Sequence, residues 1–131
     1  MAKAKKVKQL SFIMPNRVGL LSELSMAVAK EKVNINAICA YEMEDKAYFM
    51  MITDSNAKAK KALSPLGAWV QEEDVIAVEL PNKVGELQKV AKKIADSGID
   101  IRYMYGTAGT GKSSICVFKT EDDKKATRVI K

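Results

Sequence analysis

Two short turns contain the residue types best suited to binding an anion. They read Pro15-Asn16-Arg17-Val18-Gly19 and Pro81-Asn82-Lys83-Val84-Gly85. In each turn the proline ends a strand, the asparagine is able to cap free N–H groups, and the glycine leaves the first helical turn without a Cβ. Exposed amides at a helix start favour a carboxylate, and Arg17 and Lys83 add positive charge. A purely structural strand-to-helix turn would need the same glycines, so both readings stay open.

A second motif, GTAGTGKS at residues 106–113, matches the phosphate-binding loop pattern G-x-x-x-x-G-K-[ST]. That loop binds phosphate because its glycines lead from a strand into a helix start. Here the motif is followed by Ser114-Ile115-Cys116-Val117-Phe118-Lys119, which is typical of a strand. We therefore interpret the glycines as hairpin turn residues.

The two turns belong to an internal repeat. At the same spacing that separates Pro15 from Pro81, Leu21 aligns with Leu87 and Val28 with Ile94. One extra residue enters later, so that Thr53 aligns with Thr120. The coincidence of apolar positions predicts two copies of one unit.

Each copy follows a β-α-β-β-α-β pattern. Alternating apolar residues predict strands ending at Met14 and Leu80, each followed by an amphipathic helix. Hairpins follow at 33–44 with 46–53 and at 99–105 with 113–119, and short helices at 55–64 and 121–130. A fourth strand at 68–71 leaves only residues 72–74 before the next strand begins at Val75.

The second copy ends at Lys131, before any fourth strand of its own. An unpaired edge would then lie beside the strand at 75–80, and exposed edges tend to be covered. We therefore expect a homodimer that covers this edge.

The end of the first helix differs between the copies. Gly98 follows the second helix and adopts a left-handed conformation without steric cost. Its counterpart is Lys32. If Lys32 has the same geometry, it costs about 1 kcal/mol that Gly98 does not.

Composition limits the function classes. The 131 residues carry 22 Lys+Arg and 16 Asp+Glu, a net charge of +6, but Lys3, Lys5 and Lys6 lie near the N-terminus. We expect residues 1–6 to be a basic disordered tail, 7–72 to form unit 1 and 73–131 to form unit 2. The two cysteines suggest reduced thiols in the cytoplasm, and neither a secretory signal nor a membrane span is evident. Histidine is absent, which removes the commonest general base and metal ligand.

The repeated residues resemble the ACT domain family, which are small regulatory modules of ferredoxin-like fold that bind amino acids. The resemblance covers Val7 to Ile130, and NRVG at 16–19 with VNI at 33–35 are its most specific elements. NKVG at 82–85 and IDI at 99–101 repeat them. The similarity is greatest to stand-alone bacterial proteins with two ACT units. It implies an α+β fold of two tandem units, each an antiparallel sheet with helices on one face, with the second unit lacking its last strand.

The resemblance also implies a ligand site shared between units. The turn of one unit would hold a carboxylate, and the start of the other unit's second strand would hold polar groups such as an ammonium. Two positions depart from the pattern. Asp100 replaces the amide found at Asn34, so the two sites should differ, and Met14 and Leu80 give no polar contact before the turns. The implied ligand-binding residues are Asn16, Arg17, Val18, Gly19, Leu20, Asn34, Ile35, Asn82, Lys83, Val84, Gly85, Glu86, Asp100 and Ile101.

We therefore expect a regulatory protein that binds an amino acid, requires no cofactor or metal, and acts on an enzyme or transporter. The alternative is an RNA-binding module of the same topology, which would need aromatic residues on two adjacent strands. Tyr103 and Tyr105 are the best candidates for that role, although they are equally suited to hairpin packing. No nucleophile and base pair is evident, so an enzyme is not expected.

Overall fold

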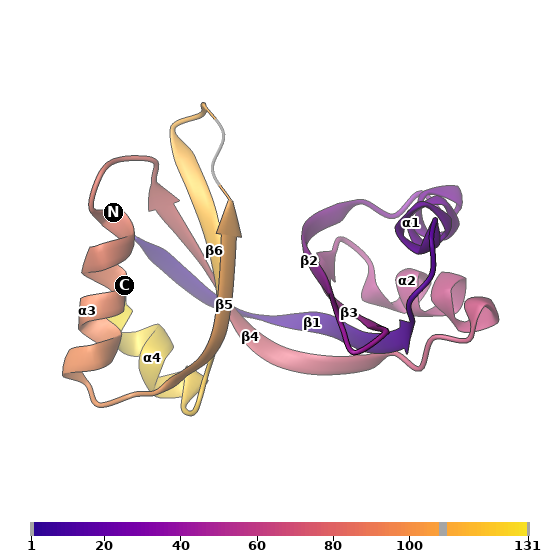
Figure 1. The fold of residues 1–131 in the computed structure, drawn as a ribbon. Coiled ribbons are helices and arrows are strands. Elements are labelled where there is room, and N and C mark those ends of the chain that lie inside the picture. Colours follow the sequence, from indigo (N-terminus) through magenta and orange to yellow (C-terminus); the bar gives the residue numbers. More distant parts are fainter. Residues whose placement is uncertain (1, 108–109, 131) are drawn as a thin grey trace. The chain divides into compact units, whose positions relative to one another are not determined.

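The structure is a computed structural model that describes residues 2–107 and 110–130. Figure 1 shows its elements. In chain order they are β1 (Lys3–Pro15), α1 (Leu20–Lys30), β2 (Ile35–Met43), β3 (Lys46–Thr53), α2 (Asn56–Leu63), the short 3-10 helix η1 (Ser64–Leu66), β4 (Gln71–Pro81), α3 (Glu86–Asp96), β5 (Ile101–Thr107), β6 (Ser113–Thr120) and α4 (Asp123–Ile130).

The chain divides into two compact units. The first unit is Lys8–Glu73, and the second combines the residues before Lys8 with those after Glu73. The strand order is β2-β3-β1-β4-β6-β5, and the division runs through β1 and β4. Within the described residues, each unit therefore has four strands and two α-helices, with η1 in addition in the first unit, and its strands follow the ferredoxin-like order, fourth-first-third-second. The hairpins and their neighbours pair antiparallel, which confirms the predicted α+β fold of two tandem units.

The prediction of a disordered tail at residues 1–6 is wrong, because β1 already begins at Lys3. Ala2 and Ala4 pack against the core of the second unit, whereas Lys3 and Lys5 are exposed. This alternation has the period of a strand. Alanine and lysine are depleted in strands, which is why composition hid it.

The strand Lys3–Val7 changes the expectation for the second unit. The second repeat ends with α4, but β1 lies beside β4 in the place of the fourth strand. The edge expected beside residues 75–80 is therefore paired on both sides, by β1 and by β6. The argument for a dimer that covers an open β4 edge is wrong.

The connection between the repeats also differs from the prediction. Ala68, Trp69 and Val70 precede the strand, and β4 then runs without interruption from Gln71 to Pro81. The acidic residues 72–74, expected to form a joint, lie inside this strand. One strand thus ends the first repeat and begins the second.

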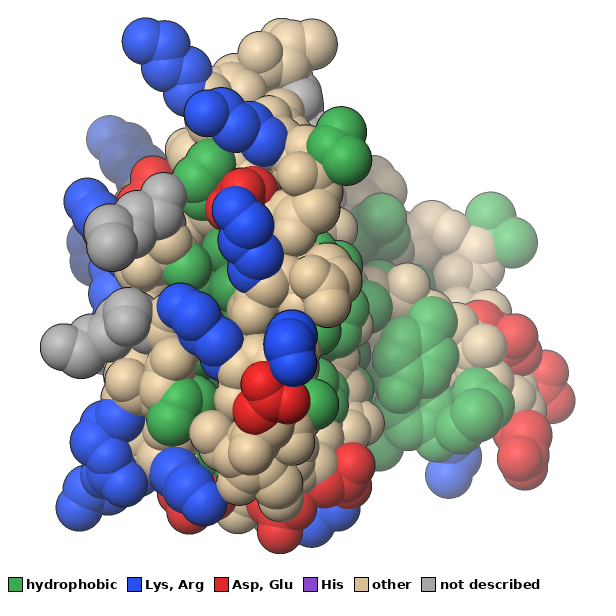
Figure 2. Space-filling view, turned by 90° about the vertical axis from the view of Figure 1, so that its left-hand side faces the viewer, with side chains coloured by type: hydrophobic (Ala, Val, Ile, Leu, Met, Phe, Trp, Pro, Cys, Tyr) green, Lys and Arg blue, Asp and Glu red, His purple; other side chains and the backbone are tan. Residues whose placement is uncertain are grey.

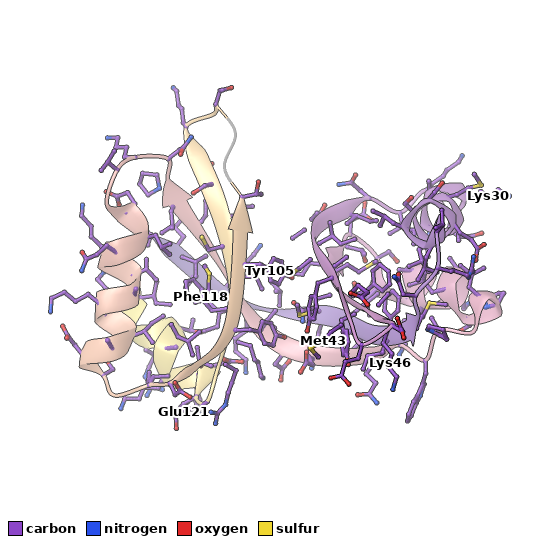
Figure 3. The ribbon with its side chains drawn as sticks, in the orientation of Figure 1. Lys30, Met43, Lys46, Tyr105, Phe118 and Glu121 are labelled. Carbon is purple, nitrogen blue, oxygen red and sulfur yellow. The ribbon has the colours of Figure 1, made fainter. Side chains whose placement is uncertain are left out.

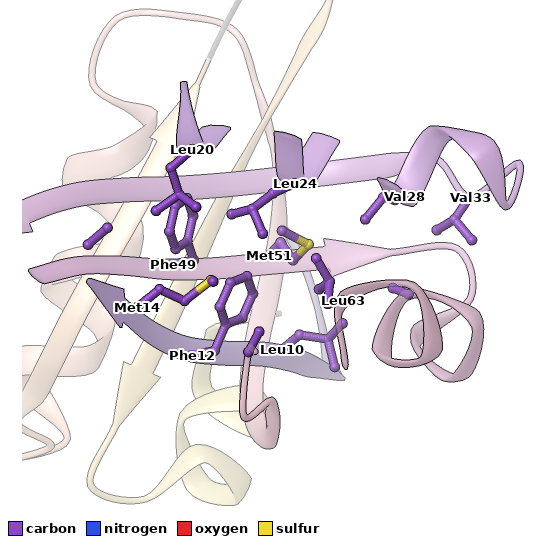
Figure 4. Close-up of a cluster of buried hydrophobic side chains, with 13 residues drawn as sticks. Leu10, Phe12, Met14, Leu20, Leu24, Val28, Val33, Phe49, Met51 and Leu63 are labelled. Atoms are coloured by element: carbon purple, nitrogen blue, oxygen red, sulfur yellow. The ribbon is translucent and has the colours of Figure 1, made fainter. Parts of the chain in front are cut away.

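Each unit has its own apolar core. In the first unit, Leu10, Phe12 and Met14 of β1 meet the buried faces of α1 and α2 (Figure 4). The rings of Phe12 and Phe49 stack with centroids 5.0 Å apart. In the second unit, Phe118 points from β6 toward α3 and α4, and Tyr105 lies on the other face of the sheet (Figure 3).

Two local predictions agree with the structure. Lys32 has a φ of 58° and its counterpart Gly98 a φ of 70°, so both take the left-handed conformation. The residues after Lys112 form β6 rather than a helix. The phosphate-binding motif therefore joins two strands of a hairpin, with positions 108 and 109 outside the described residues.

Candidate ligand-binding site

The two repeated turns have the same backbone geometry. Gly19 and Gly85 each have a φ of 86° and immediately precede α1 and α3. Only glycine takes this conformation without strain. Because glycine has no side-chain acceptor, no side chain caps either helix at this position. The Leu20 and Glu86 N–H groups donate to the Arg17 and Lys83 carbonyls, so the N–H groups of the next two residues of each helix are the ones left for water or a ligand.

The prediction that the asparagines cap the helices is wrong, because the residues at the two cap positions are Gly19 and Gly85. The Asn16 N–H donates to the Asp45 carbonyl at 2.9 Å, and the Asn82 N–H donates to the Lys112 carbonyl at 2.9 Å. The Asn82 Nδ2 also donates to the Gly111 carbonyl at 3.0 Å. Each asparagine therefore fastens its turn to the loop of the neighbouring hairpin.

A hollow of about 280 Å³ opens at the turn of the first unit, and we call it the first hollow. The turn and α1 contribute one wall, in which Leu21 and Ser22 lie. In this first turn of α1, the Leu20 N–H donates to the Arg17 carbonyl and the Glu23 N–H to the Gly19 carbonyl. The remaining lining residues are Asn16, Arg17, Gly19, Leu20, Ala40, Tyr41, Glu42, Ala47 and Phe49.

A hollow of about 360 Å³ opens at the turn of the second unit, and we call it the second hollow. It occupies the equivalent place in the repeat, since the turn, the helix start and two neighbouring strands line it again. Its lining residues are Leu80, Pro81, Asn82, Lys83, Glu86, Leu87, Met104, Gly106, Thr107, Ser114 and Cys116.

The floor of each hollow is a cross-strand pair. Ala40 lies opposite Phe49 in the first unit, and Gly106 lies opposite Cys116 in the second. The second pair has the smaller side chains, and the second hollow is the larger of the two. Sequence reasoning missed these positions, although the hairpin register and the repeat spacing contain the signal.

Charged groups at the helix starts also differ. Arg17 donates from both terminal nitrogens to the Glu23 carboxylate, and this hydrogen bonding lowers the pKa of Glu23. In the second unit, Lys89 Nζ lies 2.9 Å from Glu86 Oε2 and lowers the pKa of Glu86 in the same way. Both carboxyl groups are therefore ionised at neutral pH.

The predicted turn residues are only partly brought together. Asn16, Arg17, Gly19 and Leu20 line the first hollow. Asn82, Lys83 and Glu86 line the second hollow. Val18 and Val84 are fully exposed.

The predicted strand residues lie elsewhere in each unit. The Asn34 N–H donates to Asp54 Oδ1 at 3.0 Å, and the Asp100 N–H donates to Glu121 Oε1 at 2.7 Å. Ile35 and Ile101, the first residues of β2 and β5, are half-buried against the cores of their units. Ala40 comes six positions after Asn34, which is about 20 Å along a strand. Within one unit, therefore, Asn34 does not reach the hollow.

The described residues offer little for a metal site, a membrane span or an RNA-binding surface. Among the described residues, no group of three or more metal-binding side chains occurs and no helix could cross a membrane. Tyr41 and Tyr48, on adjacent strands, stack on each other with centroids 5.0 Å apart. On the face that α3 and α4 present, basic side chains are interspersed with acidic ones (Figure 2).

Comparisons with known proteins give a consistent result. The family model described as an ACT domain pair matches residues 5–131. The crystal structure of protein BT0572 from Bacteroides thetaiotaomicron is 32% identical, with 96% of this chain and 87% of that chain covered and a TM-score of 0.87. The regulatory subunit of aspartate kinase from Thermus thermophilus, in a ligand-free form, is 15% identical, with 97% and 93% covered and a TM-score of 0.67. The corresponding subunit from Thermus flavus is 19% identical, with 98% and 94% covered and a TM-score of 0.65. None of the curated proteins compared with this chain matches it.

Proposed function

The chain belongs to the family of ACT domain pairs, and from that premise we propose that it is a regulatory protein whose ligand is an amino acid. The observation that supports this function best is the repeated hollow beside an uncapped helix start. A carboxylate would accept hydrogen bonds from amides of the first turn, where the helix dipole favours negative charge. Arg17 and Lys83 would add attraction at the rim of each hollow.

The ammonium group would be held by the predicted residues at the start of β2 and β5. Asn34 and Asp100 have oxygen acceptors near the start of β2 and β5, and charge-assisted hydrogen bonds to an ammonium are among the strong ones. Asp100 Oδ2 already accepts from Arg102 Nη1 at 2.9 Å, whereas Asn34 donates to Asn36. This difference supports two sites of unequal affinity. In this arrangement Ile35 and Ile101 contribute apolar contact.

Regulation would pass to a separate enzyme or transporter, and the protein itself would not catalyse a reaction.

We also propose that the protein forms a homodimer, but not through the β4 edge that was first expected. The outermost strands of the described sheet are β2 and β5, and outermost strands have unpaired backbone groups that a second copy could bind. The two free cysteines support a reducing, cytoplasmic setting.

Thermal shift and calorimetry against the twenty amino acids test this function. A tryptophan at Ala40 should fill the first hollow and one at Thr107 the second, and each should abolish binding at its own site. The exposed Lys30, replaced by tryptophan at the far end of α1, is the matched control. Failure of every amino acid to bind the wild type would overturn the proposal, and salt-dependent RNA binding in its place would support the alternative module.

A further inference from the structure

The first residue of the helix differs sharply between the two hollows. In α1 it is Leu20, which is 2% exposed and belongs to the apolar core. In α3 it is Glu86, whose side chain is 16% exposed and lines the second hollow. The repeat thus places an ionised carboxylate where its partner has a buried hydrocarbon.

A carboxylate at this place changes what the helix start attracts. Each helix has an acid in its first turn, Glu23 in α1 and Glu86 in α3, and both compensate the helix dipole. The difference is position: Glu86 lines its hollow, where it repels a ligand carboxylate directly, whereas Glu23 is not among the residues that line the first hollow. The first hollow has an acid too, Glu42, but it comes from the hairpin end, where it accepts a hydrogen bond from the Asp45 N–H.

The surroundings of Glu86 offer an organic cation apolar contact, although the basic residue Lys83 also lines the second hollow. Leu80, Leu87 and Met104 provide apolar walls. Lys89 Nζ already lies 2.9 Å from Glu86 Oε2, which shows that an ammonium fits at this carboxylate. The side chain of Lys89 is 67% exposed, so a ligand would displace it at little cost.

We propose that the second hollow binds the ammonium group of an apolar amine or amino acid through Glu86, whereas the first hollow binds a carboxylate through the helix start. The two hollows of one chain therefore have opposite charge preference. The inference rests on the proposed function, because it keeps an amino acid as a ligand of the two hollows, and it changes the orientation of that ligand in the second hollow, where the ammonium replaces the carboxylate. Glu86 is the residue that determines the difference.

Three probes of one shape separate the two preferences. They are leucine, 3-methylbutylamine, which lacks the carboxylate, and 4-methylpentanoate, which lacks the ammonium. Amide NMR spectra assign binding to Gly19 and Leu21 at the first hollow or to Gly85 and Leu87 at the second. We expect the amine to perturb only the second set and the acid only the first.

Substitution of Glu86 supplies the decisive comparison. Glu86→Gln keeps the size of the side chain and should weaken amine binding about tenfold or more, since hydrogen bonds to charged groups are worth about 1.5 to 3 kcal/mol. Lys89→Ala should strengthen amine binding by removing the internal competitor. Glu23→Gln, in the first turn of α1, is the matched control and should leave amine binding unchanged.

The outcomes separate this inference from the function on which it rests. If leucine or another amino acid binds but the amine does not bind, or binds equally well to Glu86→Gln, the charge preference is wrong and the ligand function stands. If no amino acid binds either hollow while the amine still requires Glu86, the inference stands and the proposed function fails.

Discussion

Gly106 and Cys116 lie directly opposite each other on β5 and β6, and a Cβ added to Gly106 would come within 2.7 Å of Cys116 Sγ. The backbone carbonyl of Ile115 would lie 3.2 Å away. In the first unit the equivalent pair is Ala40 and Phe49, where a Cβ is present. At the floor of the second hollow, a cysteine at position 116 therefore requires a glycine at position 106.

Gly106→Ala should destabilise the protein by about 1 to 3 kcal/mol, the usual cost of overpacking. The melting temperature should fall by several degrees in a calorimetric scan. The double variant Gly106→Ala with Cys116→Ala should recover much of the loss, because the sulfur is gone. Gly111→Ala is the control, since nothing lies within 4 Å of its added Cβ. An unchanged melting temperature in the single variant would contradict the close contact.

Alkaline pH should reveal the buried thiol of Cys116. Burial raises the pKa of this thiol above its ordinary value of 9.0, so the unfolded chain releases the proton first. The stabilising contribution is fully present below pH 9 and is lost as pH rises toward the folded pKa. The stability difference between wild type and Cys116→Ala, measured by urea unfolding, should therefore decrease from pH 7 to pH 10. A constant difference would show that the thiol is not buried.

The N-terminal strand should contribute to the stability of the second unit. Ala4→Asp puts a charge where Ala4 packs against the core, and it should lower the melting temperature by several degrees. Lys5→Asp, one position along on the exposed face, should have little effect. Equal effects of the two variants would argue that residues 3–7 do not form the strand.

Lys32→Gly should be neutral or should stabilise the protein by up to about 1 kcal/mol, since Lys32 has a φ of 58° that glycine adopts freely. Gly98→Ala is the reverse experiment and should destabilise by a similar amount, because Gly98 has a φ of 70°. Thermal unfolding monitored by circular dichroism measures both. A melting temperature several degrees lower in Lys32→Gly would refute the argument.

Millimolar ATP with magnesium should leave the melting temperature unchanged. The motif at 106–113 leads into β6, so no helix start is available at its end to hold phosphate. Lys112→Ala should behave like the wild type in the same titration. A shift that disappears in Lys112→Ala would restore the nucleotide-binding interpretation.

Most of the architecture follows from periodicity. Strand alternation at Leu10, Phe12 and Met14 and helical spacing in α1 both come from burying one face. The repeat extends the assignment of the first three strands and both helices from one unit to the other. The left-handed conformation of Lys32 was predictable from Gly98 alone.

The remaining features depend on contacts between distant residues. Ala4 and the neighbouring lysines form a strand only because β4 lies beside them, and local propensity does not include that partner. The hollows have the same origin, since Gly106 and Cys116 meet only through the hairpin register. The asparagines looked like helix caps because the hairpin loops that they contact are distant in sequence.

Two neighbouring strands of the second unit are synthesised far apart in time. Residues 3–7 are synthesised well before their neighbour in the second unit, because the later half of β4 is made only after the whole first repeat. The nascent chain must therefore keep a short lysine-bearing segment unpaired while the first unit folds. Frequent charge at its exposed positions would keep that waiting segment from pairing with other chains.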